Sequence, residues 1–399
     1  MIGTGQVGGR HQGSRLILRN ARLADGALVD VEIDDGVIAA VIASTQGDVN
    51  AGAREPARAQ GSDHDIGVDV ELRGYLLLPS PVEPHAHLDK ALLASRVSNP
   101  SQGLDGAVTA MREAYATMTE KDIARRALLA TVEAISHGFT AIRTHADCGD
   151  GIGSRSVRVL VELREQLRDV IDLQVVAMVR SITGSNGASN VAMLNECMLA
   201  GADLVGAAPW REPDPRAALD QLFDVAGAFK CGVDFHMDET TDTGTFVLLK
   251  LIAAVRDQGF GAAVTASHCV SLGMQIPRVI RETSRTLAVS GISVVALPQS
   301  NLYLQGRNHK TKKLRGITPV GELLAAGVTV AGGGDNWRDP FNPMGRIDAF
   351  ETASLLVSAA HLSPQDAYAC VSRGARASMG LPSVTIACGS PADLLAILA

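Results

Sequence analysis

Short apolar segments recur along most of this chain, and each ends in polar residues and is followed by a helical stretch. From the second segment to the seventh they end about 30 residues apart, which is the length of one strand–helix unit with its connections. Eight such units predict an α/β fold, a (β/α)8 TIM-type barrel, whose active-site residues lie at the C-terminal ends of the strands. The alternative is an open doubly wound sheet, but no glycine-rich dinucleotide fingerprint follows the first strand. The segments are YLLLPSPVEPHAH, FTAIRTHAD, LQVVAMVR, DLVGAAPW, CGVDFHMDE, AAVTASHC, ISVVALPQS and VTVAGGGDN.

The chain outside these units predicts a second, smaller module. Residues 15–80 read as short strands separated by turn signals at ADG and DDG, and residues 1–14 read as a glycine-rich, disordered tail. We assign residues 81–387 to the barrel. We expect residues 388–399 to return as a strand to the N-terminal segment and to form a small β-sandwich with it. A sandwich closed by one returning strand leaves the apolar edge LLAILA, so we expect either a truncated product or an edge covered by another subunit.

Composition excludes several classes of function. The net charge is −7 over 399 residues, so a nucleic-acid partner is not expected; the basic stretch RNHKTKKLRG at 307–316 reads as a solvated loop or a subunit contact. No apolar run reaches the roughly 20 residues that span a bilayer, and the N-terminus lacks the apolar core of a signal peptide. The six cysteines form no CxxC pair. We therefore expect a cytoplasmic protein with reduced thiols and no membrane partner.

Polar residues at the predicted strand ends suggest a metal centre. Two histidines one residue apart point to the same face of a strand. Three imidazoles and one carboxylate suit Zn²⁺ or Fe²⁺, with room for a water whose pKa the metal lowers. A further glutamate and histidine remain for proton transfer and charge stabilisation. The residues are His85 and His87 on the first strand, His236 and Glu239 on the fifth, His268 on the sixth and Asp335 on the eighth.

Each of these residues also has a simpler interpretation. A histidine at a strand end can be a hydrogen-bonded structural residue, Asp335 after three glycines can cap a helix, and Glu239 can cap or pair with a base. The coincidence of ligand-type residues at four strand ends on one rim favours the metal site.

The motifs VEPHAHLDK, IRTHAD, DLQVVAM, DFHMDE, VTASH, LYLQGR and GGGDNWRDPFNPMG occur in one chain. With them the chain resembles the amidohydrolase superfamily, and more narrowly bacterial cytosine deaminase and the related triazine aminohydrolases, over residues 15–399. The resemblance implies that His85, His87, His236 and Asp335 bind one divalent metal ion. It also implies that Glu239 shuttles a proton to the substrate ring, and that His268 assists the attacking water.

The fourth predicted strand bears on the number of metal ions. Two-metal members of the superfamily bridge their ions with a modified lysine there, and DLVGAAPW contains no lysine, so a single ion is expected. His145 in RTHAD then has no place in the ligand set, and we assign it a supporting or structural role.

The third strand departs from the family pattern. Arg180 stands where cytosine deaminase and its triazine relatives usually have a glutamine that contacts the substrate ring. Arginine offers donors only, so it favours a substrate with paired carbonyls, an anionic ring or a carboxylate. The alternative is that Arg180 points away and pairs with an acid. Further substrate contacts are expected from Met178 and Phe341, where aromatic wall residues are replaced, and from Asn336, where cytosine deaminase has a second aspartate.

These observations predict a metal-dependent deaminase of a small nitrogen heterocycle, either a cytosine-like pyrimidine or a triazine, in an oxidised or anionic variant. A cyclic amide hydrolase or an N-alkylamine hydrolase is the alternative within the superfamily. A catalytically silent metal-binding scaffold is the alternative outside enzymes. Because relatives assemble, we expect a homo-oligomer.

Overall fold

The computed structural model describes residues 15–44 and 67–399. The tail predicted at residues 1–14 lies outside these described ranges. The chain folds into two units, one formed by the residues up to Pro81 with Leu381–Ala399 and the other by Val82–Gly380. No helix in the described parts of the chain has the length and hydropathy of a membrane span.

The first unit is the β module that the sequence predicts. Hydrogen bonds join its strands into one six-stranded sheet in the order β14-β5-β1-β2-β3, with β4 beside β1. The C-terminal strand β14 runs antiparallel to β5. One face of the sheet buries aliphatic side chains such as Val31, Ile38 and Leu77. The strands are β1 (Arg15–Arg22), β2 (Leu28–Asp34), β3 (Val37–Ala43), β4 (Gly67–Glu71), β5 (Tyr75–Pro79) and β14 (Leu394–Leu398).

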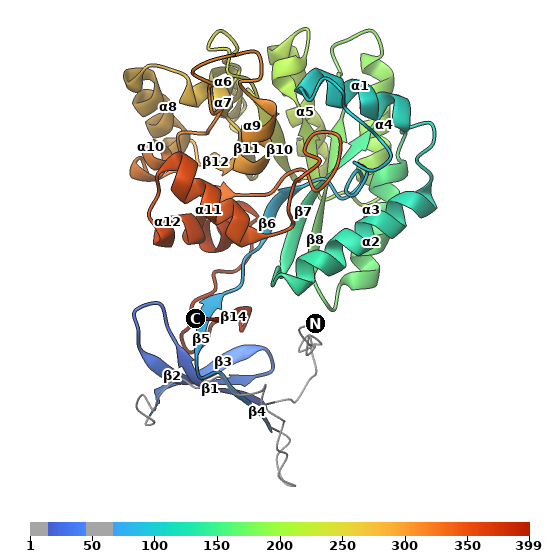
Figure 1. Ribbon diagram of the computed structural model, residues 1–399. Coiled ribbons are helices and arrows are strands. Elements are labelled where there is room, and N and C mark those ends of the chain that lie inside the picture. Colours follow the sequence, from blue (N-terminus) through green and yellow to red (C-terminus); the bar gives the residue numbers. More distant parts are fainter. Residues whose placement is uncertain (1–14, 45–66) are drawn as a thin grey trace. The chain divides into compact units, whose positions relative to one another are not determined.

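The second unit is a (β/α)8 barrel, which confirms the predicted fold class. Eight strands lie side by side in chain order, and every neighbouring pair is parallel. Figure 1 shows the helices around the outside of these strands. The strands are β6 (Glu83–Ala86), β7 (Ala141–Cys148), β8 (Asp172–Val179), β9 (Leu204–Ala207), β10 (Gly232–Met237), β11 (Val264–His268), β12 (Ser293–Ala296) and β13 (Val330–Gly332).

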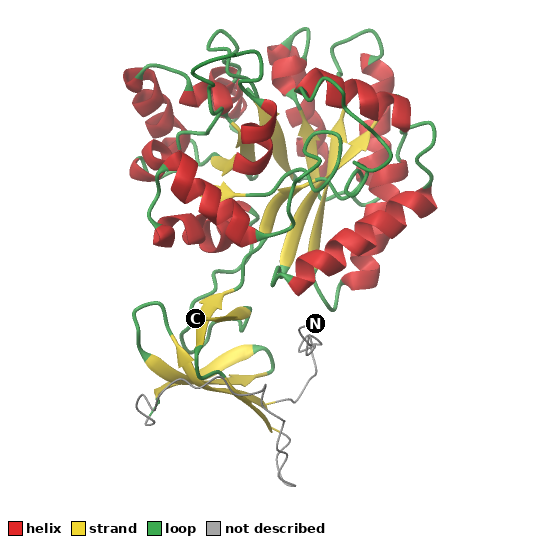
Figure 2. Cartoon of the chain, in the orientation of Figure 1, coloured by secondary structure: helices red, strands yellow, loops and turns green. Residues whose placement is uncertain are grey.

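Some of the covering helices begin at a side chain that satisfies a free N–H group of the first turn. Thr119 accepts from the Asp122 N–H at the start of α2, and Asp214 caps α5 ahead of Pro215. Figure 2 shows these helices in red and the strands that they cover in yellow. The helices are α1 (Leu104–Ala114), α2 (Glu120–Ser136), α3 (Arg155–Leu167), α4 (Gly187–Leu199), α5 (Pro215–Phe229), α6 (Leu248–Gln258), α7 (Val270–Gly273), α8 (Pro277–Val289), α9 (Pro298–Leu304), α10 (Val320–Ala325), α11 (Ala349–Ala360), α12 (Pro364–Ala369) and α13 (Ala375–Ser378), with short turns at Pro209–Arg211 and Cys370–Gly374.

The barrel closes where the chain after β13 meets β6. The Asp335 N–H donates to the His85 carbonyl at 2.9 Å, and the Glu83 carboxyl accepts from the Gly334 N–H at 2.9 Å. Gly333 fits because it has no side chain: a Cβ there would lie 2.6 Å from Glu83 Oε1 and 3.0 Å from Leu297 Cδ2. The closure therefore depends on a close approach of backbone to a buried carboxyl.

A Gly333→Ala substitution tests this closure. The φ of Gly333 is not in the left-handed region, so the penalty is steric. We expect a loss of about 1–3 kcal/mol from overpacking, seen as a lower midpoint of thermal unfolding. Gly227→Ala in α5 is the control: nothing lies within 4 Å of the added Cβ, so it should gain up to about 1 kcal/mol from helix propensity. Equal midpoints for the two variants would contradict a tight closure.

Candidate functional site

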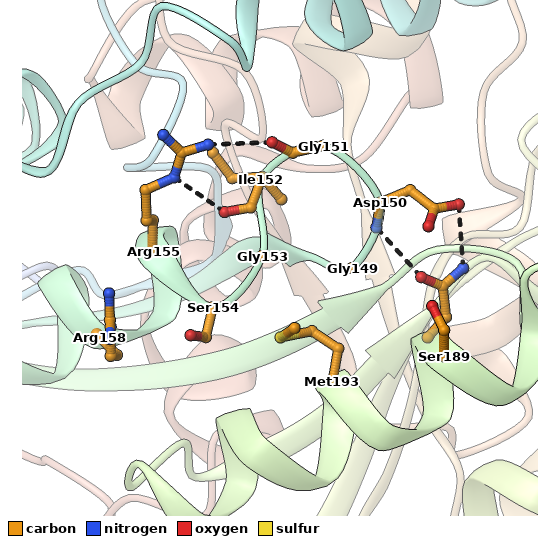
Figure 3. A pocket seen from close by; sticks show the side chains of 11 residues that line it. Gly149, Asp150, Gly151, Ile152, Gly153, Ser154, Arg155, Arg158, Ser189 and Met193 are labelled. Atoms are coloured by element: carbon orange, nitrogen blue, oxygen red, sulfur yellow. Dashed lines mark hydrogen bonds between the residues drawn. The ribbon is translucent and has the colours of Figure 1, made fainter.

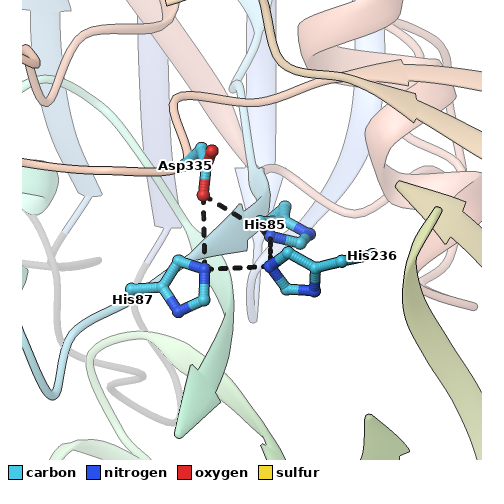
Figure 4. A group of neighbouring side chains, drawn as sticks. All are labelled: His85, His87, His236 and Asp335. Carbon is cyan, nitrogen blue, oxygen red and sulfur yellow. Dashed lines mark hydrogen bonds and ion pairs between the residues drawn. The ribbon is translucent and has the colours of Figure 1, made fainter. Parts of the chain in front are cut away.

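Four of the predicted residues meet at the C-terminal end of the barrel. Their ligand atoms all lie within 4.8 Å of one another, and all four side chains are buried. The Nε2 atoms of His85 and His87 each lie 3.2 Å from His236 Nε2, and His87 Nε2 lies 3.3 Å from Asp335 Oδ1. Figure 4 shows the three rings and the carboxylate facing one another. This group, the His₃Asp cluster, joins side chains from β6, β10 and the loop after β13.

The protonation states of the cluster suit a cation. Burial and the neighbouring imidazoles lower the pKa of His85 and His236, and burial and Lys90 lower the pKa of His87, so the rings are neutral. Burial alone would raise the pKa of Asp335, but its contacts with His87 and His268 outweigh this and lower it. Asp335 Oδ1 is buried without a hydrogen-bond partner. Three neutral imidazoles and a carboxylate are the forms that bind a divalent ion.

A buried polar layer fixes the orientation of His85. Its Nδ1 lies 2.9 Å from Ser267 Oγ, which donates to Asp234 Oδ1 at 2.9 Å, and Asp234 is paired with Arg143 at 3.0 Å. For Nε2 to bind a cation, Nδ1 must carry the proton and donate it to Ser267, and this layer accepts it.

His145, whose role the sequence left as supporting or structural, lies in the same layer. Its ring stacks on His85 with centroids 3.9 Å apart, and its Nε2 is 3.4 Å from Asp234 Oδ1. It contributes no atom to the His₃Asp cluster, although His85, His145 and Asp234 are also close enough to form a group of possible ligands. The pairing of Asp234 with Arg143 makes that second group a support for His85.

His268 and Glu239 lie beside the cluster. His268 Nδ1 is 3.0 Å from Asn301 Oδ1, while its Nε2 has no hydrogen-bond partner and lies 4.0 Å from Asp335 Oδ2. His268 and Asp335 both have left-handed backbone, with φ of 71° and 62°, an uncommon conformation that aims their side chains. Burial raises the pKa of Glu239 from 4.5 to about 7, so this carboxyl can both hold and release a proton near neutral pH.

The cluster opens into a cavity of about 230 Å³. The predicted substrate residues Met178, Arg180, Asn336 and Phe341 all line it, together with Glu239 and His268. The amide of Asn336 is already engaged, because it accepts from Ser300 at 3.0 Å and donates to Asp339 at 2.9 Å. Arg180 and the cluster therefore border the same cavity, from different strands.

Arg180 retains donors for a ligand. Its Nη2 donates to the Tyr115 hydroxyl and its guanidinium stacks on the Tyr115 ring at 4.8 Å, but its buried Nε has no partner. Trp210, which also lines the cavity, has a buried Nε1 without a partner. Among the described residues no ion pair of Arg180 with a carboxylate is found, and the alternative in which it turns away from the site is not the arrangement seen. Two residues that line the cavity thus each carry a buried N–H without a partner.

The sequence did not single out several residues that support the site. Lys90 Nζ lies 3.1 Å from His87 Nδ1 and 2.9 Å from Asp147 Oδ2, and Asp147 accepts from the Tyr115 hydroxyl at 2.6 Å. Lys90 and Asp147 occur in the motifs HAHLDK and IRTHAD, and Trp210 ends DLVGAAPW. Their positions at predicted strand ends could therefore have marked them as residues near the site. Tyr115 comes from α1 and its continuation, where the sequence carries no motif.

Comparisons with known proteins agree with this geometry. The model of the amidohydrolase family matches residues 104–398. A pterin deaminase from Rhizobium rhizogenes is 37% identical over 331 residues, which cover 82% of this chain and 76% of that protein. The structure of 5-methylcytosine deaminase from Klebsiella pneumoniae with 5-fluorocytosine superposes with a TM-score of 0.80 at 28% identity, covering 92% of this chain and 86% of the other. That of N-isopropylammelide isopropylaminohydrolase from Burkholderia multivorans has a TM-score of 0.79 at 27% identity, covering 97% and 92%.

Removal of one imidazole tests the metal centre. We expect the purified protein to retain about one divalent ion per chain, and His236→Ala to reduce the affinity at least about 10- to 100-fold, the usual effect of losing even an outer partner of a metal ligand. The measurement is elemental analysis after dialysis, which also distinguishes zinc from iron. His137→Ala, an exposed histidine at the end of α2, is the control. Equal metal content in the two variants would contradict the site.

Proposed function

The chain belongs to the amidohydrolase family, and within it we propose a metal-dependent hydrolytic deaminase of pterin or a similar 2-amino-4-oxo bicyclic heterocycle. The family makes it a hydrolase of carbon–nitrogen bonds. This proposal replaces the single-ring pyrimidine or triazine that the sequence predicted with a bicyclic ring, since the pterin deaminase is more similar in sequence than the compared solved structures of the cytosine and triazine enzymes.

The observation that carries this proposal is the set of unused donors at Arg180. A pterin presents its 4-carbonyl oxygen and ring nitrogen N5 side by side, two acceptors and no donor. Guanine presents the same pair, O6 and N7, and arginine is the usual side chain that binds both at once. The edge of cytosine away from its reacting ring nitrogen N3 presents one acceptor, O2, and the N1–H, and that N–H would face a guanidinium that cannot accept. The unpartnered Trp210 Nε1 adds a further donor to the same cavity.

The residues of the cavity divide the work of the reaction. A divalent ion held by the His₃Asp cluster would lower the pKa of a water toward neutrality. Asp335 accepts the proton that the attacking water releases, and His268 stabilises the charge that develops. Glu239 delivers a proton to the ring nitrogen next to the attacked carbon. Asp335 passes its proton to the amino group, which leaves as ammonia when the carbon–amino bond breaks, and the remaining hydroxyl proton returns to Glu239 as the carbonyl forms.

A second candidate is removal of an alkylamine from a triazine. It is favoured by the likeness to N-isopropylammelide isopropylaminohydrolase. The chemistry is the same apart from the leaving group, so the amine that is released distinguishes the two. A silent scaffold is disfavoured by Glu239, because a buried carboxyl with a pKa near 7 beside the cluster has no structural partner of its own among the described hydrogen bonds.

The experiment is product analysis with three substrates: pterin, cytosine and N-isopropylammelide. We expect ammonia from pterin at the highest kcat/KM. Glu239→Gln should keep its metal and lose at least about 100-fold in kcat, since it removes the proton donor. Glu322→Gln, an exposed glutamate on α10, should leave kcat unchanged. Isopropylamine as the main product would support the second candidate, and an active Glu239→Gln would contradict the role of Glu239.

The pH dependence tests the same carboxyl. Glu239 must be protonated to deliver its proton, so kcat/KM should fall as the pH rises through about 7, approaching tenfold per pH unit. An ordinary glutamate with a pKa of 4.5 would begin the decline near pH 4.5, so kcat/KM would already fall across the whole measured range instead of bending near pH 7. The measurement is kcat/KM between pH 5 and 9, corrected for the titration of the free substrate. A profile that stays flat through pH 7 would remove Glu239 as the acid.

A further inference from the structure

Arg180 is held in the cavity by the hydroxyl of Tyr115, a residue that lies in none of the sequence motifs. Tyr115 is 1% exposed, and its hydroxyl lies between two charged groups. It donates to Asp147 Oδ2 at 2.6 Å and accepts from Arg180 Nη2. The ring also forms the surface on which the guanidinium stacks, at 4.8 Å. Tyr115 therefore fixes both the position and the plane of the Arg180 head group.

The charges around Tyr115 set the direction of its hydrogen bonds. Burial would raise the pKa of Asp147, but Lys90, 2.9 Å away, and Arg180 hold it well below the usual range, so it is a carboxylate. Burial and Asp147 raise the pKa of Tyr115, so the hydroxyl keeps its proton. That proton goes to Asp147, and the oxygen lone pairs remain for Arg180. Phenylalanine can provide the ring but neither of these bonds.

A glycine turn, residues 149–153, supports Tyr115 from behind. Its ends pair through the Gly153 N–H to the Gly149 carbonyl at 2.8 Å. Arg155 donates to the carbonyls of Ile152 at 3.1 Å, Gly151 at 3.0 Å and Tyr115 at 3.3 Å, and Figure 3 shows the first two of these bonds. A Cβ at Gly151, which has a φ of +85°, would lie 3.3 Å from Tyr115 Cδ2. The turn lines a hollow that shares no lining residue with the substrate cavity.

We propose that Tyr115 is the positioning residue that determines specificity: through its hydroxyl it holds Arg180 so that the guanidinium meets two acceptors of a substrate. This proposal rests on the proposed function. The negative charge of Asp147 already acts on Arg180, and without the hydroxyl between them a direct pairing with this carboxylate would draw the donors away from the ligand. Tyr115 acts through Arg180 and touches no reacting atom.

The test is a double-mutant cycle of Tyr115→Phe, Arg180→Gln and the double variant. Pterin is the substrate that offers two acceptors, O4 and N5, at one edge, and cytosine is the comparison, whose edge away from the reacting N3 offers one acceptor beside an N–H. A hydrogen bond to a charged group contributes a factor of about 10 to 100 in affinity. Tyr115→Phe should therefore raise KM for pterin by at least about tenfold, with kcat changed less than about threefold and KM for cytosine little affected. In the Arg180→Gln background the same substitution should change KM less than about threefold.

Two further variants separate positioning from folding. Tyr303→Phe, on α9 and outside the cavity lining, should match the wild type. Arg155→Lys keeps the charge but cannot bond to as many carbonyls, and it should shift KM for pterin in the same direction as Tyr115→Phe. Variants are compared only if their unfolding midpoints equal that of the wild type. If Tyr115→Phe fails to fold, Arg155→Lys takes its place as the test of positioning.

The outcomes distinguish this proposal from the proposed function. The positioning role of Tyr115 is overturned if the free-energy effects of Tyr115→Phe and Arg180→Gln on KM are fully additive. It is also overturned if Tyr115→Phe lowers kcat equally for both substrates. In either case the deaminase assignment stands. The same double-mutant cycle can be measured without turnover, as the Kd for pterin, from the quenching of pterin fluorescence on binding. Binding without ammonia release would overturn only the deaminase assignment. A wild type that neither binds nor deaminates pterin would overturn both.

Discussion

The contact between the first barrel strand and the chain after the last one is the constraint on which the site depends. The His₃Asp cluster takes His85 and His87 from β6 and Asp335 from beyond β13, so the cluster exists only if the barrel is closed. The bond from the Asp335 N–H to the His85 carbonyl sets the register of the two segments, and Glu83 holds the turn before Asp335 through the Gly334 N–H. A cation bound by side chains from both sides would link the same two segments a second time. Metal binding and barrel stability are therefore coupled, and a ligand of the folded state stabilises it by mass action.

Burial raises the pKa of both acids of the site, and the neighbouring positive charges decide whether that effect is outweighed. Asp147 has Lys90 at 2.9 Å and stays ionised, with a pKa held below the usual range. Glu239 forms no ion pair with a lysine or arginine among the described residues; burial, which His268 at 3.8 Å and Arg211 oppose only in part, raises its pKa to about 7. The first acid can act as a fixed acceptor that orients a hydroxyl, and the second can exchange a proton at neutral pH. One buried region thus contains a structural carboxylate and a reactive carboxyl, as the two roles require.

The barrel and the His₃Asp cluster were predictable because they depend on local pattern and on one rule of topology. A strand–helix repeat predicts the barrel, the carboxyl ends of its parallel strands share one rim, and His85, His87, His236 and Asp335 stand at those ends. Tyr115 was not predictable in this way, because it reaches the cavity from the chain after β6 and meets Asp147 and Arg180 through contacts between distant residues. The orientation of Arg180 could not be read from sequence for the same reason: whether an arginine at a strand end faces a cavity or an acid is decided by what packs beside it. The β-module strands followed from the turn signals that separate short strand-like segments, but the pairing of β14 with β5 required the tertiary fold.

Arg180, which stands where relatives usually have a glutamine, needs neighbouring side chains that hold its longer side chain in place. Its side chain has more rotatable bonds, and fixing it costs conformational entropy of up to about 2 kcal/mol. The ring and the hydroxyl of Tyr115 meet this cost before a ligand arrives, so less of the binding free energy is lost in ordering the site. Under the proposed function, a ligand without an acceptor for the buried Nε would leave that donor unsatisfied, and such penalties discriminate more strongly than apolar contacts do. Selectivity at Arg180 is thus a property of three residues from three segments, and exchanging the arginine alone would change the donor set without supplying the support that a different side chain needs.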